Sequence, residues 1–422
     1  MLPSLLFLSK RCASSTAAAA PQLTREFIHE ALYSKESGYF TSLDVIHHFE
    51  SPIDFPSLLG EADYRAALAD KFDKGSGKWM TPSEIFGAPF SAAVATYVTK
   101  EFTRLDQRQR KASRSQRESK NERELVIYEL GAGSGTQALN FLNHLKEYSP
   151  DLYKHTLYHT VEISPRLAKQ QLKRVGPHHS NFKVINQDIL SWSTHQKTER
   201  RPCFVLAFEL LDNLPQDKIS WWEEEGGDKG NESKHHLCEA VIVAAKEPKR
   251  GDFSASSGSL VASLASGTPL AREHSATFVP TGQLQLVEVL KNSFPAHRAM
   301  MFDFDSLPPP APLHPSDPLD PSLAVDLPLP AALEPLTSSR DRHAHLAKDL
   351  PSYLVQPGTA DIFFPIDFIN LQALYNGICR SEPHASKAKL LKQGAFMSMH
   401  APLMQTKTRT GYNPLVEDFE NT

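Results

Sequence analysis

The chain has 422 residues, with 45 lysine and arginine residues against 49 acidic residues, and 40% of its residues are hydrophobic. This composition is that of an ordinary globular protein, so it excludes collagen-like chains, wholly disordered chains and small disulfide scaffolds. The length allows two or three domains, or one elaborated α/β domain with a large core.

Residues 1–22 are predicted to be a mitochondrial presequence. They contain Lys10 and Arg11 but no acidic residue, and they are rich in Ser, Thr and Ala. The apolar run Leu5–Leu8 is too short for a secretory signal or a membrane span. A disordered tail without a targeting role is the alternative. No later segment is apolar enough to span a membrane, so we expect a soluble protein of the mitochondrial matrix.

Residues 23–103 are expected to form an N-terminal helical segment, and a basic polar stretch follows at residues 104–123. That stretch carries eight basic and three acidic residues, without aromatic residues or an apolar period. A nucleic-acid site would need interleaved aromatic or apolar groups, so we predict a solvated insertion and no nucleic-acid partner. The rest of the mature chain is acidic, which gives a weak indication of a cationic substrate.

From residue 124 onward, short apolar runs alternate with helical patterns. The expected strands cover residues 126–130, 157–163, 183–187, 204–208, 240–245 and 300–304. Pro165 suits the first turn of a helix after the second strand, and residues 282–293 fit a helix before the sixth. This alternation predicts an α/β fold with a mostly parallel sheet and helices on both faces.

Ten of the 31 prolines lie within residues 308–335. Proline fixes φ and lacks a backbone donor, so no helix or central strand is expected there. We interpret residues 307–358 as a proline-rich insertion; a substrate-covering flap or a proline-rich partner ligand are the alternatives. It separates a core of residues 124–306 from residues 359–422, where we expect a strand over 362–366, a helix from Asp367 and a strand near 395–399.

Cysteine and histidine give no sign of a metal site. The four cysteines are scattered without a CxxC pair, so neither a disulfide framework nor a zinc site is predicted. The histidine pairs, among them His178 and His179, have no acidic or cysteine partner at ligand spacing, and we interpret them as surface residues.

A glycine-rich turn follows the first strand of the core. Gly131, Gly133, Gly135 and Thr136 lie in the run Glu129–Thr136, ELGAGSGT. Small residues allow backbone N–H groups and a helix N-terminus to approach a charged ligand closely. A dinucleotide fingerprint would need Gly where Thr136 stands, so the G-x-G-x-G spacing favours the nucleoside-binding loop of class I methyltransferases. A plain strand–helix turn is the alternative.

Acidic residues follow the next two strands. Glu162, followed by Ile163, is placed to accept the hydroxyl groups of a ribose. Asp188 is placed to accept a hydrogen bond from an adenine amine, with Ile189 against the ring. A helix-capping glutamate and a turn-forming aspartate are the respective alternatives.

Two carboxylates follow the fourth strand, in the run Phe208–Pro215, FELLDNLP. Glu209 and Asp212 lie where the reactive part of a bound cofactor would project in a doubly wound sheet. Folding seldom needs two acids three residues apart in a tight turn, so we favour a catalytic role.

These motifs, in this order and spacing, resemble the MidA family of methyltransferases. The resemblance includes ELGAGSGT, HTVEISPRLAKQQ and FELLDNLP, and it extends to residues 27–40, 78–87, 302–304 and 360–371. Two departures stand out. The family's Asn-Glu pair is Phe208-Glu209 here, and its "iDYG" segment is Phe302–Asp305, FDFD.

The resemblance implies a class I, Rossmann-like methyltransferase fold and S-adenosyl-L-methionine as cofactor. The family's mitochondrial members are protein arginine methyltransferases that act in complex I assembly, so it also implies symmetric dimethylation of an arginine on a complex I subunit. Our hypothesis makes Glu209 the partner of the guanidinium, with Asp212 ordering the loop or sharing that task.

The same hypothesis has Thr81, Pro82 and Glu84 closing the site from the N-terminal segment. Two alternatives stay open, the first of them because of the changes at Phe208 and at Phe364, which lies in the 360–371 segment. One is an assembly factor that binds the cofactor without catalysis, and the other is a methyltransferase for a small molecule or another protein side chain. The sequence does not predict an oligomeric state.

Overall fold

The structure is a computed structural model that describes residues 22–43, 45–46, 51–74, 79–112, 124–224, 234–244, 260–264, 271–307, 336–339, 348–350, 353–379 and 387–418. The predicted presequence, except Gln22, and the proline-rich stretch 308–335 lie outside these residues. None of the described helices is both long enough and apolar enough to cross a bilayer.

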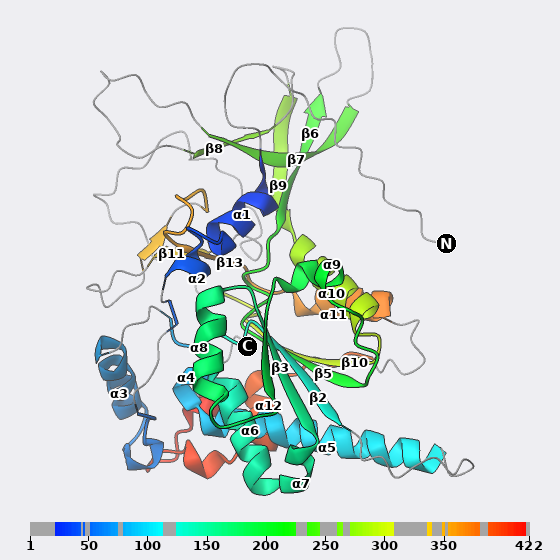
Figure 1. Cartoon of the computed structure of the whole chain (residues 1–422). Coiled ribbons are helices and arrows are strands. Elements are labelled where there is room, and N and C mark those ends of the chain that lie inside the picture. The colour runs from blue at the N-terminus through cyan, green and yellow to red at the C-terminus, as the bar shows by residue number, and fades with distance from the viewer. Residues whose placement is uncertain are drawn as a thin grey trace.

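A five-stranded parallel sheet forms the centre of the molecule, in the order β10-β5-β2-β3-β4 (Figure 1). Its strands are β2 (Leu125–Leu130), β3 (Thr156–Glu162), β4 (Phe182–Asn186), β5 (Cys203–Phe208) and β10 (His297–Phe302). Five of the six predicted core strands are therefore confirmed. The class I methyltransferase-like α/β fold is confirmed with them.

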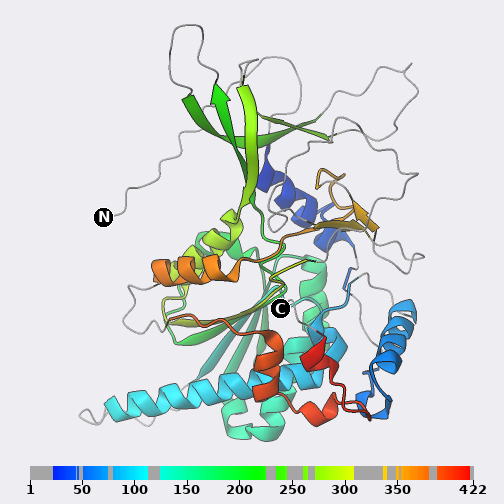
Figure 2. The ribbon, with the colours of Figure 1, turned by 180° about the vertical axis from the view of Figure 1, so that it is seen from behind.

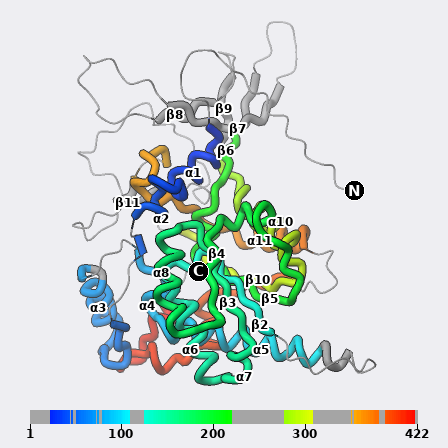
Figure 3. The backbone as a smooth tube through the Cα atoms, in the orientation of Figure 1, coloured from blue at the N-terminus to red at the C-terminus, as the bar shows by residue number. Residues whose placement is uncertain are grey.

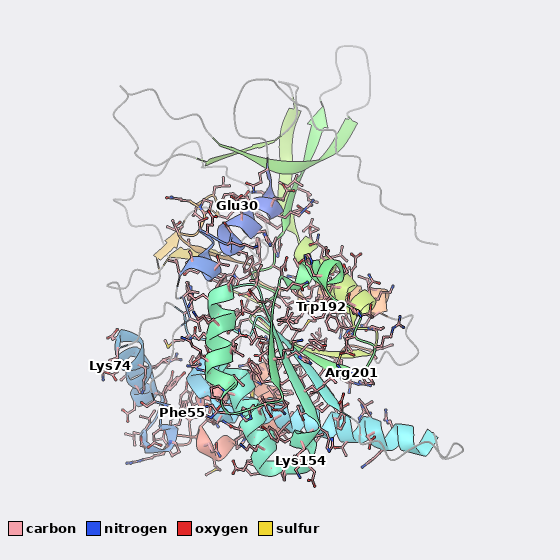
Figure 4. All side chains as sticks on the ribbon, in the orientation of Figure 1. Glu30, Phe55, Lys74, Lys154, Trp192 and Arg201 are labelled. Carbon is pink, nitrogen blue, oxygen red and sulfur yellow. The ribbon has the colours of Figure 1, made fainter. Side chains whose placement is uncertain are left out.

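Helices cover both faces of this sheet (Figures 1 and 2). Side chains of β2 alternate between two cores, as a strand requires. Ile127 packs into the core that includes residues of α5 and α6, and Val126 into the core that includes residues of α10 and α11. In the second core, Trp192 lies near α10 (Figure 4), with its ring 4.9 Å from that of Phe294.

The helices of the core and its C-terminal part keep the predicted order, with α8 starting at Pro165 and α10 preceding β10. Their bounds are α6 (Thr136–Tyr148), α7 (Pro150–Lys154), α8 (Pro165–Val175), η2 (Ile189–Ser191), α9 (Trp192–His195), α10 (Thr281–Ser293), α11 (Phe368–Cys379), α12 (Gln393–His400), η4 (Leu403–Gln405) and α13 (Pro414–Glu417).

The N-terminal segment is mainly helical. It comprises α1 (Thr24–Tyr33), α2 (Tyr39–Ser42), η1 (Phe55–Ser57), α3 (Glu61–Lys74), α4 (Pro82–Phe86) and α5 (Ala88–Ala112). Helix α5 contains the first part of the basic stretch predicted as a polar insertion. The tube in Figure 3 shows α1 and α2 beside β11 (Leu336–Ser339), which is distant in sequence. Phe27 of α1 packs in one core with Ile362, which lies in the strand that pairs with β11.

The predicted strand at residues 240–245 does not belong to the parallel sheet. It lies in β7 (Lys234–Ala244), which pairs antiparallel with β1 (Gln22–Leu23), β6 (Asp217–Glu224) and β8 (Leu260–Leu264), while β9 (Ala271–Val279) pairs with β6. Strands β6 to β9 of this second sheet lie between β5 and α10 in the sequence, so the chain leaves the core after β5 and returns to it before α10. An apolar run identifies a strand, but it does not identify the sheet to which the strand belongs.

Two other expectations also need correction. The strand predicted over 362–366 is β13 (Asp361–Phe363), and it pairs antiparallel in a separate sheet with β11 (Leu336–Ser339), which also pairs with β12 (Lys348–Leu350). Residues 395–399 form part of helix α12 and no strand. The buried residues Gln393, Phe396 and Met397 have helical spacing, and periodicity alone separates short buried helices poorly from strands.

Candidate active site

The glycine turn lies between β2 and α6, as predicted. Gly131 and Gly133 have φ values of 64° and 51°, in the left-handed region that favours glycine. A Cβ atom on Gly133 would lie 2.9 Å from Cδ1 of Ile46. Gly135 is the N-cap of α6. A side chain at Gly133 would therefore be strained by the positive φ and would have to displace the tip of Ile46, and the turn exposes backbone at the carboxyl end of β2.

Polar side chains surround this turn. The hydroxyl of Thr136 accepts a hydrogen bond from Arg174, and Nη1 of Arg174 also lies 2.6 Å from Oγ of Ser134. The Ser134 hydroxyl donates in turn to Glu84, which is buried. Thr136, predicted to contact the cofactor, thus already has protein partners, and its network reaches the N-terminal segment.

Glu162 lies at the end of β3 and is buried. Its carboxylate accepts hydrogen bonds from the N–H of Ser164 at 2.9 Å and from Nε2 of Gln171 at 3.1 Å. The same Gln171 amide donates to the carbonyl of Gly133 at 2.9 Å, which ties Glu162 to the glycine turn. Burial raises the pKa of Glu162 to about 7. Ile163 follows and is partly exposed.

Asp188 ends the loop after β4. One of its carboxylate oxygens accepts from the N–H of Leu190 at 2.9 Å and caps η2, and the other lies 3.7 Å from Nε2 of His29. Its side chain is 27% exposed and so stays accessible to a ligand. Ile189 is buried in the core on the α10 side of the sheet.

Glu209, directly after β5, has an unusual backbone. Its φ is 49°, the only positive φ outside glycine among the residues that the structure describes. Holding a non-glycine residue there costs about 1 kcal/mol or more, and such residues cluster at functional sites. Burial, and then the nearby Asp303, raise the pKa of Glu209 well above its ordinary value.

Asp212 has a different environment. It is 5% exposed, and its Oδ1 atom has no hydrogen-bond partner within the part of the chain that the structure describes. Burial raises its pKa well above the usual value, and the charges of Asp303 and Asp361 add to the effect. The backbone carbonyl of Asp212 accepts a hydrogen bond from the N–H of Phe364 at 2.9 Å. Asp212 thus connects its loop to the residue that follows β13.

A cleft joins the glycine turn to the N-terminal segment. Its lining comprises Ile46, Thr81, Pro82, Ser83, Glu84, Phe90, Glu129, Gly131, Ala132, Gly133, Ser134, Phe208, Glu209, Phe302, Asp303 and Gln393. Thr81 caps α4, and Pro82 starts that helix. The cleft thus brings together the predicted residues Thr81, Pro82, Glu84, Gly131, Gly133 and Glu209. The lining does not include Gly135, Thr136, Glu162, Ile163, Asp188, Ile189 or Asp212.

Sequence reasoning missed an aromatic wall of the cleft. The rings of Phe90, Phe208 and Phe302 pack with centroids 5.2–6.0 Å apart. Phe208 and Phe302 lie in the two segments that depart from the family pattern, and these departures were the sequence signal that could have pointed to the aromatic wall. Phe90 lies on α5, where nothing in the sequence separates it from an ordinary core residue.

Glu129 was also missed as a site residue, although it directly precedes the glycine turn. It is 3% exposed, and its Oε2 atom accepts a 2.8 Å hydrogen bond from the hydroxyl of Tyr158. Burial raises its pKa to about 8, an effect that the repulsion from Glu162 increases. Glu129 therefore joins Glu209 among the carboxyl groups that line the cleft.

Within the described residues, no three His, Cys, Asp or Glu side chains are grouped so that they would hold a metal ion. His179 is not a surface residue, contrary to the prediction. It is 2% exposed, with its ring nitrogens 2.9 Å from the Tyr153 hydroxyl and 3.1 Å from Oδ1 of Asn143. Burial lowers its pKa to about 4, so it remains neutral.

Comparisons with known proteins find one curated relative and several solved structures that resemble this chain. Over 99 residues, the chain is 28% identical to the mitochondrial protein arginine methyltransferase NDUFAF7 homologue of Schizosaccharomyces pombe, and the match spans 22% of this chain and 21% of that protein. A Burkholderia thailandensis protein crystallised with S-adenosyl-homocysteine has a TM-score of 0.49 and 16% identity, over 85% of this chain and 72% of that one. A native crystal structure from the same organism has a TM-score of 0.46.

The family model described as "Putative S-adenosyl-L-methionine-dependent methyltransferase" matches residues 94–386. This range covers more than half of the chain. It includes the glycine turn, the loop of Glu209 and the whole parallel sheet. The chain therefore belongs to this family of S-adenosyl-L-methionine-dependent methyltransferases.

Proposed function

We propose that this protein is a mitochondrial protein arginine methyltransferase that forms symmetric dimethylarginine on a subunit of respiratory complex I and so supports assembly of the complex. One observation carries the choice of a cationic acceptor. The described residues that line the cleft include the carboxyl groups of Glu84, Glu129 and Glu209 and no Lys, Arg or His, while the carboxyl group of Asp303 in the same lining is bonded to backbone N–H groups. The name of the Schizosaccharomyces pombe relative, a mitochondrial protein arginine methyltransferase homologue, supports arginine as the acceptor and mitochondria as the location.

The residues present fit S-adenosyl-L-methionine. Its methionine part needs close approach to backbone, which the turn without a side chain at Gly133 offers. Its positive charges suit a cleft whose lining is acidic. In this proposal Gly131, Gly133 and Gly135 would hold the methionine part, with Glu129 near its ammonium group. Glu162 would accept from the ribose and Asp188 from the adenine amine.

The cofactor supplies an electrophilic methyl group on its sulfonium. The acceptor is difficult because an arginine guanidinium is protonated and its lone pairs are delocalised. A carboxylate beside the guanidinium draws the positive charge onto the nitrogens that it contacts, so the nitrogen that faces the methyl group keeps more lone-pair density and is held in place. We assign this role to Glu209, whose raised pKa falls when a cation arrives, because ion pairing favours the carboxylate form.

The proton balance gives Glu209 a second task. When the acceptor nitrogen forms its bond to the methyl carbon, the carbon–sulfur bond breaks and the sulfur keeps the electron pair. The nitrogen then carries one proton too many for a monocationic product. Glu209 is the carboxylate at the end of β5 that can take this proton and pass it to water. The aromatic wall excludes water from the other side of the guanidinium.

The proposal is tested with the full-length protein and methyl-tritiated S-adenosyl-L-methionine. Two degenerate peptide libraries serve as acceptors, one with a central arginine and a matched one with a central lysine. We expect label only on the arginine peptides, and mass spectrometry of fragment ions should identify symmetric dimethylarginine. Label on the lysine peptides would instead support a methyltransferase for another protein side chain. Tight cofactor binding without any transfer would support an assembly factor that binds the cofactor without catalysis.

The biological part of the proposal has its own test. Complex I subunits from cells with and without the gene are compared by mass spectrometry for one arginine that loses its dimethyl mark. A fluorescent fusion of the full chain is compared with the same fusion carrying Lys10→Ser and Arg11→Ser. We expect only the first to enter mitochondria, since presequence import needs positive charge.

A further inference from the structure

The carboxylate of Asp303 holds the loop that carries Glu209. Its Oδ2 atom accepts hydrogen bonds from three consecutive backbone N–H groups, those of Leu210 at 3.2 Å, Leu211 at 2.8 Å and Asp212 at 3.2 Å. Successive N–H groups that converge on one point form an anion-binding concavity. Here the anion is a side chain of the protein itself, and it comes from the end of β10.

A second contact joins the same two strand ends. The N–H of Glu209 donates to the carbonyl of Phe302 at 2.9 Å, so four successive residues of the loop are bonded to Phe302 or Asp303. Glu209 itself has the positive φ described above. A strained backbone persists only where its surroundings fix it, and the bonds to β10 provide that constraint.

Asp303 is committed to this contact. It is 1% exposed, and its Oδ1 atom accepts from the N–H of Phe304 at 2.9 Å, so both carboxylate oxygens have backbone partners. A buried carboxylate next to Glu209 and Asp212 would otherwise be repelled by them. Burial raises the pKa of Asp303 to about 7, and the backbone donors oppose this shift, so its carboxylate form is used by the protein although it also borders the cleft.

We infer that Asp303 is a positioning residue for methyl transfer: by clamping residues 210–212 it fixes the Glu209 carboxylate at the cleft. The inference rests on the proposed role of Glu209. Asp303 touches neither acceptor nor cofactor in this account, and it acts only through the backbone of the loop. Its loss should consequently slow the chemical step and leave binding nearly unchanged.

The test compares Asp303→Asn with the matched control Asp305→Asn, whose carboxylate pairs with Lys392 outside the clamp. An amide at 303 carries no negative charge and accepts at one atom only. For Asp303→Asn we expect kcat on the arginine peptides to fall about 100-fold, as for a misplaced catalytic group. KM and the Kd for S-adenosyl-homocysteine should stay within about threefold, and the control should match the wild type.

A double-mutant cycle separates positioning from an independent effect. If Asp303 acts through Glu209, adding Asp303→Asn to Glu209→Gln should lower the residual single-turnover rate by less than about threefold. Multiplicative losses, or a fall in cofactor affinity that accounts for the lost turnover, would overturn the inference. Full activity of Asp303→Asn while Glu209→Gln is inactive would overturn it and leave the proposed function intact.

Hydrogen exchange tests the clamp without any methyl acceptor, so the result stands even if the arginine proposal fails. The amides of residues 210–212 should exchange at least about tenfold faster in Asp303→Asn, and those of β5 should not change. Asp303→Glu keeps a carboxylate acceptor and should restore part of the protection and part of kcat. If the amides of residues 210–212 are equally protected from exchange in the wild type and in Asp303→Asn, the inference that Asp303 holds this loop is wrong.

Discussion

The guanidinium of Arg174 lies 3.6 Å from the carboxylate of Glu84. This ion pair joins α8, which follows the second strand of the core, to α4 in the N-terminal segment. Glu84 is 6% exposed and Arg174 27%, so the pair is largely shielded from water. Through Ser134 it also contacts the glycine turn. The N-terminal segment is thus fastened to the turn proposed to bind the cofactor.

The first prediction concerns this pair. Glu84→Gln should lower the free energy of unfolding by about 1–3 kcal/mol, because a mostly buried arginine loses its counter-charge. A double-mutant cycle with Arg174→Met, measured by urea unfolding, should give a coupling of about 1 kcal/mol or more. The same cycle on the exposed pair Asp151–Lys154 is the control and should give less than about 0.5 kcal/mol. Equal couplings would contradict the shielding argument.

The second prediction concerns Glu209. Glu209→Gln keeps the shape of the side chain and removes its charge, so methyl transfer to arginine peptides should fall by about 1000-fold or more. The Kd for S-adenosyl-homocysteine, measured by calorimetry, should change by less than about threefold. Turnover equal to that of the wild type would remove Glu209 from the mechanism.

The third prediction concerns the cofactor. Gly133→Val requires a β-branched residue at a φ of 51° and places its side chain against Ile46. We expect calorimetry to show at least about 100-fold weaker binding of S-adenosyl-L-methionine, since the valine takes space next to the exposed backbone. Gly377→Val on α11 is the matched control, because a Cβ there meets no atom within 4 Å. If Gly133→Val binds as tightly as the control, the assignment of the glycine turn is wrong.

The fourth prediction concerns pH. The pKa of Glu129 is about 8 in the folded protein against an ordinary value of 4.5, mainly because of burial. The folded state therefore holds this proton more tightly than the unfolded state. Its contribution to stability is fully present below pH 4.5 and is lost as the pH rises toward 8.

Glu129→Gln removes this titration and keeps an oxygen for the Tyr158 hydroxyl. Its stability relative to the wild type should consequently rise between pH 5 and pH 8, by up to about 1.4 kcal/mol per pH unit. Urea unfolding of both proteins at each pH measures the difference. A difference that is constant over this range would show that Glu129 does not titrate as its burial implies.

The central sheet could be predicted because its strands are short apolar runs whose ends carry glycine or acidic residues. The same signal failed for residues 240–245 and 395–399. In the first case the strand is real but pairs in another sheet, and in the second a partly buried helix of eight residues has the apolar content of a strand. Pairing partners depend on tertiary contacts, which a local pattern does not contain.

The site could be predicted only as far as motifs lie next to one another in sequence. Glu209 follows its strand directly, and the structure places it at the cleft. The clamp on its loop comes from Asp303, which is 93 residues from Leu210 in sequence, and it forms only where β5 and β10 lie side by side. Phe90 likewise reaches the cleft from a helix whose sequence reads as ordinary core.

The antiparallel sheet leaves and re-enters the core at nearly the same point. The Thr281 hydroxyl donates to Oδ2 of Asp217 at 2.7 Å across 64 residues of sequence, and the N–H of Gly282 donates to the carbonyl of Pro215 at 2.8 Å. When the two ends of a chain segment are joined in this way, the free-energy cost of closing it depends only weakly on its length, since doubling a loop costs only about 0.6 kcal/mol. A change in the length of this segment should therefore leave the strand ends of the parallel sheet where they are.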